Sequence, residues 1–379
     1  MNLMREAYLD NSATTQVSPE VAKVIYESMC GVYGNPSSLH SKGLEAELEL
    51  EKARETLSAA MGAKPQEVYF TSGGSEGNNA AIYGLAQKRR RFRRVVISGY
   101  EHPSVERAAR RLERDGFEIV ELVPGADGRI SPETAANAVD NDTAFVSVMF
   151  VNNETGAIND ISGIAKAIKR KNPDVPLHTD AVQAFGKLRL GCDKLGAQVV
   201  TVSGHKLHAP KGIGAMYIQK GFTLQPFIVG GGQQSGQRSG TEPVAMAVGL
   251  ALAAQTACQN IDVNMQKVRQ LRERLLELIG GEEDVFLNSP EDALPYIVNI
   301  SAVGIRSEIM LHYLERRGIY VSSGSACSKG AKSHVLAAAG LSGERIDSAL
   351  RISFSAYNTQ EDVEALAQGI HDARAELKR

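Results

Sequence analysis

The chain has 379 residues, of which 43% are hydrophobic and 23% are charged. This composition is typical of a globular protein with a sizeable core, and it excludes a disordered, fibrous or membrane-embedded chain. The 42 lysines and arginines against 44 aspartates and glutamates give a formal net charge of -2, so no strong field is available to attract nucleic acid or anionic lipid.

Short β-branched runs alternate with helical patterns along most of the chain. A first helix is expected to start at Ser18-Pro19-Glu20, because serine and proline are typical residues at a helix start. Beyond Glu67, helical patterns separate strand-like runs at 68–70, 95–97, 119–120, 145–150, 177–179 and 199–202. This alternation predicts βαβ units around a mostly parallel, buried sheet, which is an α/β fold.

The last third of the chain predicts a second and smaller α/β unit. Long helical patterns run from about residue 243 to 279, and further strand-like runs at 296–300, 319–321 and 350–354 alternate with helices. At 379 residues the chain also exceeds the size at which a single core usually stops growing. We therefore predict a large domain over 16–257 and a small domain formed by 1–15 and 258–379.

The cysteines and the start of the chain indicate the compartment. Four cysteines are scattered without CxxC pairs, which argues against a disulfide framework and against a metal site. Residues 1–8 resemble neither a signal peptide nor a transit peptide, and no later segment approaches a membrane-spanning length. We expect a cytoplasmic protein without a membrane partner.

A run of small residues at 71–79, with the sequence TSGGSEGNN, lies between a predicted strand and a predicted helix. Exposed amides and the helix dipole at such a turn would bind a phosphate group. The run lacks both the Gly-Lys-Ser/Thr ending of a Walker loop and the GxGxxG pattern of dinucleotide-binding folds. Taken alone the signal is weak, because glycine-rich turns between a strand and a helix are common structural joints.

Two charged residues follow predicted strands at the edge of the sheet where open α/β folds bind ligands. Asp180 follows the strand at 177–179, and its carboxylate could pair with a pyridinium nitrogen. Lys206 follows the strand at 199–202 and could form a Schiff base with an aldehyde cofactor, although a single loop lysine is more often an exposed surface residue. A phosphate turn, an acid and a lysine are the three anchors that pyridoxal 5'-phosphate requires, so we predict this cofactor.

Motifs along the chain resemble those of the cysteine desulfurases, in the class V aminotransferase group of fold type I pyridoxal-phosphate enzymes. The resemblance covers nearly the whole chain and rests on YLDNSATT (8–15), GNPSS (34–38), EH (101–102), NNETG (152–156), RSGT (238–241) and SSGSAC (322–327). It implies a fold type I transferase with a mostly parallel central sheet in a large domain and a smaller α/β domain.

The resemblance implies how the cofactor would be held. Lys206 would bind its aldehyde, Asp180 would keep the ring nitrogen protonated, and His102 would stack on the ring and shuttle protons. Gln183 would hydrogen-bond the ring oxygen, and Asn153 would help to position ring and substrate. The phosphate would be held by Gly74, Ser75, Ser203, His205 and, from the other subunit of a homodimer, Thr241.

The resemblance also implies that the substrate is L-cysteine. Arg351 would grip its carboxylate, a task suited to a planar guanidinium, and Asn153 and Asn35 would contact it. Cys327 would attack the substrate sulfur and carry it away as a persulfide, leaving L-alanine. From local sequence alone, Arg351 could instead belong to a structural ion pair, and Cys327 could be an inert buried thiol.

The acceptor of the sulfur is expected to be a protein, either an iron–sulfur scaffold or a tRNA-thiolation enzyme. The segment between Cys327 and Val335 is shorter than in many members of the family, so we hypothesise that this acceptor docks close to the mouth of the site. Two alternatives stay open. One is an aminotransferase or selenocysteine-type lyase in which Cys327 is incidental, and the other is a protein that works chiefly as an assembly scaffold.

Overall fold

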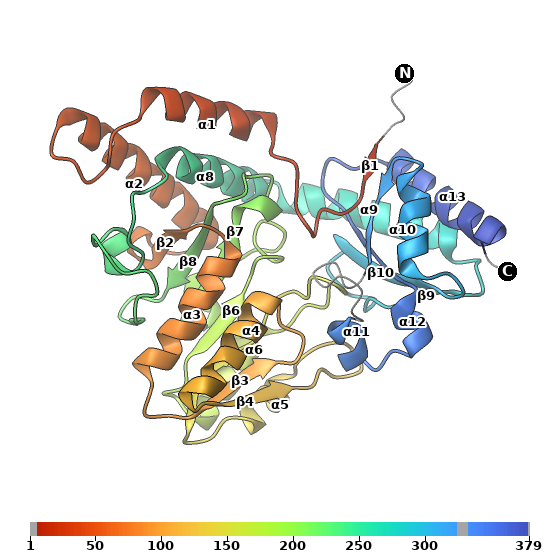
Figure 1. Ribbon diagram of the computed structural model, residues 1–379, viewed down its shortest axis with the longest axis horizontal. Helices are drawn as coiled ribbons and strands as arrows, with labels where there is room; N and C mark the ends of the chain where they lie inside the picture. The colour runs from red at the N-terminus through yellow and green to blue at the C-terminus, as the bar shows by residue number, and fades with distance from the viewer. Residues whose placement is uncertain (1–5, 324–332, 378–379) are drawn as a thin grey trace.

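A computed structural model of the chain describes residues 6–323 and 333–377, and Cys327 lies outside these ranges. Two groups of elements lie next to each other (Figure 1). One group is built on a large sheet, and the other on a smaller sheet formed mainly by the C-terminal part of the chain. The N-terminal strand pairs with a strand of the second group.

The large sheet has seven strands within the described residues. Their spatial order is β2 (Val68–Thr71), β8 (Gly214–Ile218), β7 (Val199–Ser203), β6 (Leu177–Asp180), β5 (Thr143–Ser147), β3 (Arg94–Ser98) and β4 (Glu118–Leu122). Strand β8 pairs antiparallel with both neighbours, and the other neighbouring pairs are parallel. The predicted α/β fold with a mostly parallel sheet is confirmed, although β8 was not among the predicted strands.

The helices of this group cover both faces of the sheet. They are α1 (Pro19–Gly31), α2 (Ser41–Met61), α3 (Gly74–Lys88), α4 (Pro103–Arg111), α5 (Pro132–Asn137), α6 (Ile161–Lys171), α7 (Cys192–Leu195) and α8 (Val244–Gln259), with 3-10 turns η1 (Pro65–Glu67), η2 (Leu112–Asp115), η3 (Gly204–Lys206) and η4 (Gln234–Gly236). Helix α1 begins as predicted, because the Ser18 side chain accepts a hydrogen bond from the Val21 amide.

Alternate residues of the central strands pack on opposite helix layers. On β3, Val95 and Ile97 pack in the core beside α3 and α4, whereas Val96 packs in the core that includes α2, α6 and α8. All three side chains are fully buried. Since both faces are covered, these strands appear in the sequence as continuous apolar runs, which is why they could be predicted.

The second group has an antiparallel sheet of order β12 (Ser322–Ser323), β13 (Ala349–Ser353), β10 (Ile297–Ala302) and β9 (Val285–Leu287), and a parallel pair, β1 (Ala7–Tyr8) and β11 (Ile319–Tyr320). Its helices are α9 (Ile261–Ile279), α10 (Ser307–Glu315), α11 (His334–Ala338), α12 (Gly343–Asp347) and α13 (Gln360–Leu377). Strand β1 continues toward β13, where the Ser353 amide donates to the Leu9 carbonyl at 2.7 Å.

A bend of 70° separates α8 from α9. Helix α8 packs on α1 and α2, whereas α9 packs on α13. The predicted boundary after residue 257 lies close to this bend, and the division into two domains there stays a prediction. In the described part of the chain, no single helix is long and apolar enough to span a membrane, and only the bent pair α8–α9 meets the length and composition limits when taken together.

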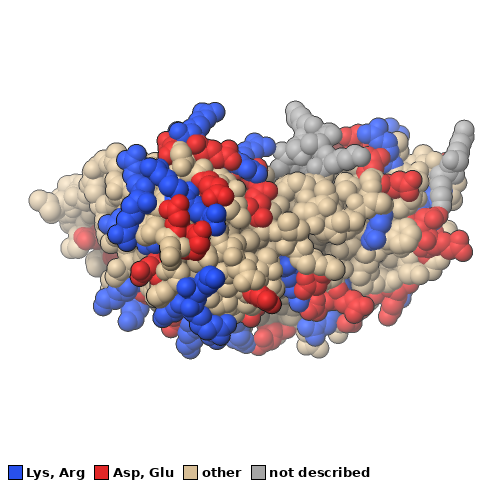
Figure 2. Space-filling view, turned by 90° about the horizontal axis from the view of Figure 1, so that it is seen from below, with Lys and Arg blue, Asp and Glu red and all other residues tan. Residues whose placement is uncertain are grey.

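Charges of both signs are interspersed over the face shown in Figure 2. The basic run at 88–94 begins at the end of α3, and its Arg94 is paired with Glu118 at 3.1 Å and with Asp140 at 2.6 Å. This arrangement is that of a solvated helix end followed by a strand.

Candidate active site

A cavity of about 550 Å³ lies at the carboxyl ends of the parallel strands. Strands β6 and β7 are neighbours and end at Asp180 and Ser203, so that their last residues meet at one edge of the sheet. The cavity brings together ten of the predicted site residues: Gly74, Ser75, His102, Asn153, Asp180, Gln183, Ser203, His205, Lys206 and Arg351.

Two of the remaining predicted residues lie outside the cavity, and the third is not among the described residues. Asn35 is exposed outside the cavity, and its side-chain oxygen accepts a hydrogen bond from the Ser37 amide at 3.0 Å. Thr241 is exposed and does not line the cavity of its own chain. Cys327 lies outside the described residues. The roles of all three stay predictions, and that of Thr241 requires a second subunit.

The start of α3 forms one end of the cavity. Gly73 precedes the helix with a φ of 152°, in a region that favours glycine. A Cβ atom on Gly74 would lie 2.9 Å from a methyl group of Val182, so a larger residue would not fit there. Ser203 contributes a buried hydroxyl that has no hydrogen-bond partner among the described residues. Free amides at a helix start beside an unpaired hydroxyl suit a phosphate group.

Asp180 is buried at the end of β6 and is held by two neutral donors. Asn78 donates to one carboxylate oxygen at 2.7 Å, and the Val182 amide donates to the other at 2.9 Å. Sequence reasoning did not identify Asn78. The available signal was its place one helical turn after Gly74, which puts both residues on the same face of α3.

His102 caps the start of α4 at the cavity wall. Its Nδ1 accepts a hydrogen bond from the Ser104 amide at 3.1 Å, so in the neutral ring the proton lies on Nε2. Burial lowers the pKa of His102, and the nearby Lys206 lowers it further, although Asp180 acts in the opposite direction. His102 is therefore neutral at pH 7 and presents one donor and one acceptor nitrogen.

The N-terminal segment holds Lys206. The ammonium of Lys206 donates to the backbone carbonyls of Ser12 and Ala13, the latter at 2.7 Å. The same segment docks on η3, since the Thr15 amide donates to the His205 carbonyl at 2.9 Å. Backbone carbonyls leave no local sequence signature, so these contacts could not be predicted.

Arg351 lines the cavity from strand β13, in the second group of elements. Its side chain is only 4% exposed and pairs with Asp10 at 2.9 Å. One guanidinium nitrogen also donates to the Asn153 carbonyl at 3.3 Å, and Nε has no partner within the described residues. The structure therefore contains the ion pair considered from the sequence, and it places that pair at the wall of the cavity.

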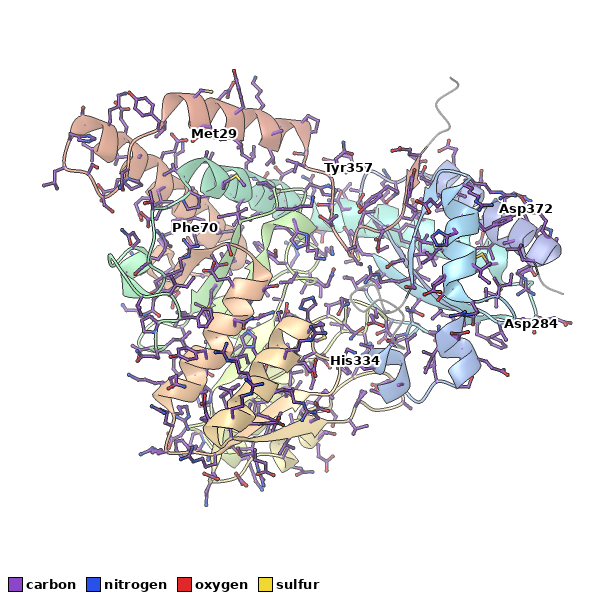
Figure 3. The ribbon with its side chains drawn as sticks, viewed as in Figure 1. Met29, Phe70, Asp284, His334, Tyr357 and Asp372 are labelled. Carbon is purple, nitrogen blue, oxygen red and sulfur yellow. The ribbon has the colours of Figure 1, made fainter. Side chains whose placement is uncertain are left out.

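The ends of the segment that contains Cys327 lie next to this wall. In the pairing of β12 with β13, Ser322 stands opposite Arg351. On the other side of the segment, the buried Ser333 donates to the carboxylate of Glu154, which follows the cavity residue Asn153 in the chain. Figure 3 shows His334, at the start of α11, where the two groups of elements face each other.

The family follows from comparison with known proteins. Residues 7–366 match the family model described as Aminotransferase class-V. A solved structure titled NifS-like protein superimposes with a TM-score of 0.93 at 34% sequence identity, covering 98% of this chain and 100% of that one. The chain is thus a class-V aminotransferase in fold, which confirms the predicted fold class.

Individual relatives narrow the assignment. Cysteine desulfurase IscS from Clostridium botulinum is 39% identical over 367 residues, covering 95% of this chain and 92% of that protein. A structure titled SspA in complex with cysteine has a TM-score of 0.83 at 33% identity, covering 94% of this chain and 100% of the other. Within the class-V aminotransferases, the chain belongs to the cysteine desulfurase family.

Proposed function

We propose that the protein binds pyridoxal 5'-phosphate in the cavity and converts L-cysteine to L-alanine, with the sulfur passing to Cys327. The observation that carries this proposal is that Lys206 and Asp180, from the ends of neighbouring strands, line the same cavity as the start of α3. The related SspA structure, titled as a complex with cysteine, supports the choice of substrate.

The residues present fit this cofactor. Asp180 is a buried carboxylate that pairs with no lysine or arginine among the described residues, and it accepts from two neutral donors, Asn78 and the Val182 amide. A buried carboxylate of this kind favours a protonated ring nitrogen as its counter-charge. The unpaired hydroxyl of Ser203 beside the start of α3 fits the phosphate. When bound, the cofactor supplies an electron sink for the substrate carbon.

The chain's own residues then have separate tasks. Lys206 supplies the amine that holds the cofactor, and His102, neutral with a proton on Nε2, can donate that proton and receive another. Arg351 binds the substrate carboxylate with its planar guanidinium, as its place at the cavity wall favours. Gln183 and Asn153, which also line the cavity, orient ring and substrate.

The sulfur step is balanced without any added oxidant. The Cys327 thiolate attacks the substrate sulfur, a sulfur–sulfur bond forms, and the carbon–sulfur bond breaks. The electron pair of the broken carbon–sulfur bond stays on the carbon, which takes up a proton to give alanine. Cys327 is four residues from Ser323, which is paired in β12, so an extended chain could carry it at most about 14 Å from that anchor.

An absorbance experiment tests the proposal. The purified protein should show the visible absorbance of a bound pyridoxal cofactor, and L-cysteine alone should yield alanine. An aminotransferase would instead need a keto acid as amino-group acceptor. Cys327→Ala should keep the absorbance but form no persulfide by mass spectrometry. Lack of cofactor binding would favour the scaffold alternative, and undiminished sulfide release by Cys327→Ala would overturn the role of this thiol.

We also propose that the protein is a homodimer in which Thr241 completes the partner's phosphate site. Large apolar side chains are exposed along the first two helices and between them: Tyr26, Met29, Tyr33, Leu39, Leu44 and Leu48. Met29 lies on α1, at an outer edge of the molecule (Figure 3). The turn before Thr241 packs against α2, because the buried Arg54 of that helix donates to Gln234 at 2.9 Å.

Subunit mixing tests this arrangement. Thr241→Ala lacks the hydroxyl that it would lend to its partner, and Lys206→Ala lacks the amine in its own site. A mixed dimer would contain one complete site, so mixing two inactive or weakened proteins should restore turnover. No recovery, with mixed dimers shown by mass spectrometry, would mean that Thr241 does not act across the interface.

For the acceptor, we propose an iron–sulfur scaffold or a tRNA-thiolation enzyme that docks close to the mouth of the cavity. Support comes from the anchors at Ser322 and Ser333, which keep both ends of the Cys327 segment near Arg351 and Glu154. Persulfide transfer to candidate acceptors, followed by mass spectrometry, tests this idea. Equal transfer to a site that docks remotely would contradict it.

A further inference from the structure

Lys187 is a buried lysine behind the active site that sequence reasoning did not identify. Lys187 is only 7% exposed, and its Nζ donates to the side-chain oxygen of Gln183 at 3.0 Å. The same Nζ lies 5.7 Å from the centre of the Tyr296 ring. A second cavity of about 250 Å³ is lined by both Lys187 and Lys206, and Lys206 also lines the main cavity.

The surroundings of Lys187 disfavour the charged form of its amine. Burial lowers its pKa to about 7, and the positive charges of Lys206 and Arg351 add to this effect. His205 and His208 also face it, and burial lowers the pKa of both rings. No carboxylate pairs with Lys187 in the described ranges 6–323 and 333–377. An aliphatic side chain at this buried position would be at least as stable, so stability does not explain why an amine is present.

The hydrogen bonds of Gln183 supply that explanation. The Ser12 carbonyl can only accept, and it lies 3.0 Å from the Gln183 side-chain nitrogen. The side-chain oxygen of Gln183 must then face Lys187, which donates to it. Together these partners exclude the flipped carboxamide, and they leave the second N–H of Gln183 for a ligand, because the nitrogen carries two hydrogens. Gln183 also lines the main cavity.

We propose that Lys187 is a positioning residue that fixes the carboxamide of Gln183, so that an N–H is held ready for the ring oxygen of the bound cofactor. The inference rests on the proposed function, since it requires Gln183 to meet the cofactor. Without Lys187 only the Ser12 carbonyl holds the carboxamide, so the donor at the cavity is less firmly fixed. Lys187 itself does not touch the cofactor.

A double-mutant cycle tests this role. Gln183→Leu should weaken binding of pyridoxal 5'-phosphate about tenfold, measured by equilibrium dialysis, and should shift the absorbance maximum of the bound cofactor. Lys187→Met should weaken binding about three- to fivefold and shift the maximum in the same direction. Because Lys187 acts through Gln183, adding Lys187→Met to Gln183→Leu should cause no further loss.

Matched variants separate this role from a general loss of structure. Lys187→Met should melt no lower than the parent, because it removes a buried amine without leaving a cavity. Lys187→Gln keeps an N–H donor, and its affinity should stay within about twofold of the parent. Lys194→Met removes an exposed lysine from α7 and should leave affinity and spectrum unchanged.

The outcomes are distinguishable. Additive losses in the cycle, unchanged affinity and spectrum in Lys187→Met, or a large loss in Lys187→Gln would each overturn the positioning role while leaving the proposed function intact. A parent protein that acquires no cofactor absorbance would overturn the proposed function, and this inference with it.

Discussion

The two ends of the cavity are built in different ways. The end proposed to bind the cofactor includes the last residues of two neighbouring strands of one sheet, Asp180 and Ser203, so the parallel strands alone bring them together. The substrate end is assembled from segments far apart in the chain: Asp10 after β1, Asn153 in the loop after β5, and Arg351 on β13. The first end follows from the fold, whereas the second depends on contacts between distant segments.

Their electrostatics differ as well. Asp180 is satisfied by neutral donors, which leaves its charge for a ligand. Arg351 already has an internal carboxylate as its partner, so a substrate carboxylate must compete with Asp10 or share the guanidinium with it. Among the described residues, Asp180 thus has no counter-charge from lysine or arginine, whereas Arg351 is already neutralised by Asp10.

The largest expected effect comes from replacing Lys206, the residue proposed to hold the cofactor. Lys206→Ala removes the amine that donates hydrogen bonds to the carbonyls of Ser12 and Ala13. The visible absorbance of the bound cofactor and the production of alanine should both fall below detection, because no other lysine of the main cavity follows a strand end in this way. Full turnover by this variant would mean that another amine holds the cofactor.

The substrate end should fail in a different manner. Arg351→Ala should raise KM for L-cysteine about 100-fold, since the bidentate grip on a carboxylate is lost, and it should leave the cofactor absorbance unchanged. Arg351→Lys, which keeps the charge but loses the planar fork, should recover only part of this loss. Loss of cofactor absorbance in Arg351→Ala would show that the two ends are not independent.

The same contrast explains what the sequence could predict. Asp180 and Lys206 follow apolar runs that are buried on both faces, so their place at the sheet edge could be inferred from local patterns. Strand β8 was missed, although its five residues are buried, and the reversed direction of this strand has no signature in the sequence. The α/β fold and the cysteine desulfurase family are confirmed, whereas the domain boundary and the residue roles stay predictions.

Contacts between distant segments could not be predicted. Asp10 meets Arg351 across 341 positions, and Gln183 meets the Ser12 carbonyl across 171. Neither pair leaves a local pattern, because any carboxylate or carbonyl could serve if the fold brought it there. Asn78 was closer to prediction, since it lies in the same run of small residues as Gly74.

A buried acid next to the cavity residue His102 in the chain gives a prediction about pH. Glu101 accepts hydrogen bonds from Ser98 at 2.6 Å and from the Met149 amide at 2.8 Å, and Met149 lies on the loop that leads to Asn153. Burial raises the pKa of Glu101 to about 8. Because the folded state holds this proton more tightly than the unfolded state, its contribution to stability falls as pH rises from about 4.5 to about 8.

Glu101→Gln removes this titration and keeps the shape of the side chain. The melting temperature of the variant relative to the parent should therefore rise by about 3–6 °C between pH 6 and pH 9. Glu133→Gln, on the surface helix α5, provides the control for loss of a carboxylate. A difference in melting temperature that stays constant over this pH range would show that Glu101 is not protonated in the fold.

The smallest expected effect is that of Asp10→Asn on KM. It tests directly whether the internal partner of Arg351 makes the two ends of the cavity differ. Asp10→Asn removes the negative charge that occupies Arg351 in the free protein but keeps a hydrogen-bond acceptor of the same shape. Substrate no longer has to displace a carboxylate, so KM for L-cysteine should fall about threefold while kcat stays within about twofold. The guanidinium is nearly buried, and the loss of its counter-charge should lower the free energy of unfolding by about 1–3 kcal/mol.

Inhibition by a simple carboxylate such as acetate separates this explanation from a change elsewhere in the site. If Asp10 competes with carboxylates for Arg351, acetate should inhibit Asp10→Asn more strongly than the parent, and Arg351→Ala should abolish the difference between them. A higher KM in Asp10→Asn would mean that Asp10 holds Arg351 in the position that binds substrate, rather than competing for it. The ion pair would then be part of a prepared site, and the two ends of the cavity would be more alike than their partners suggest.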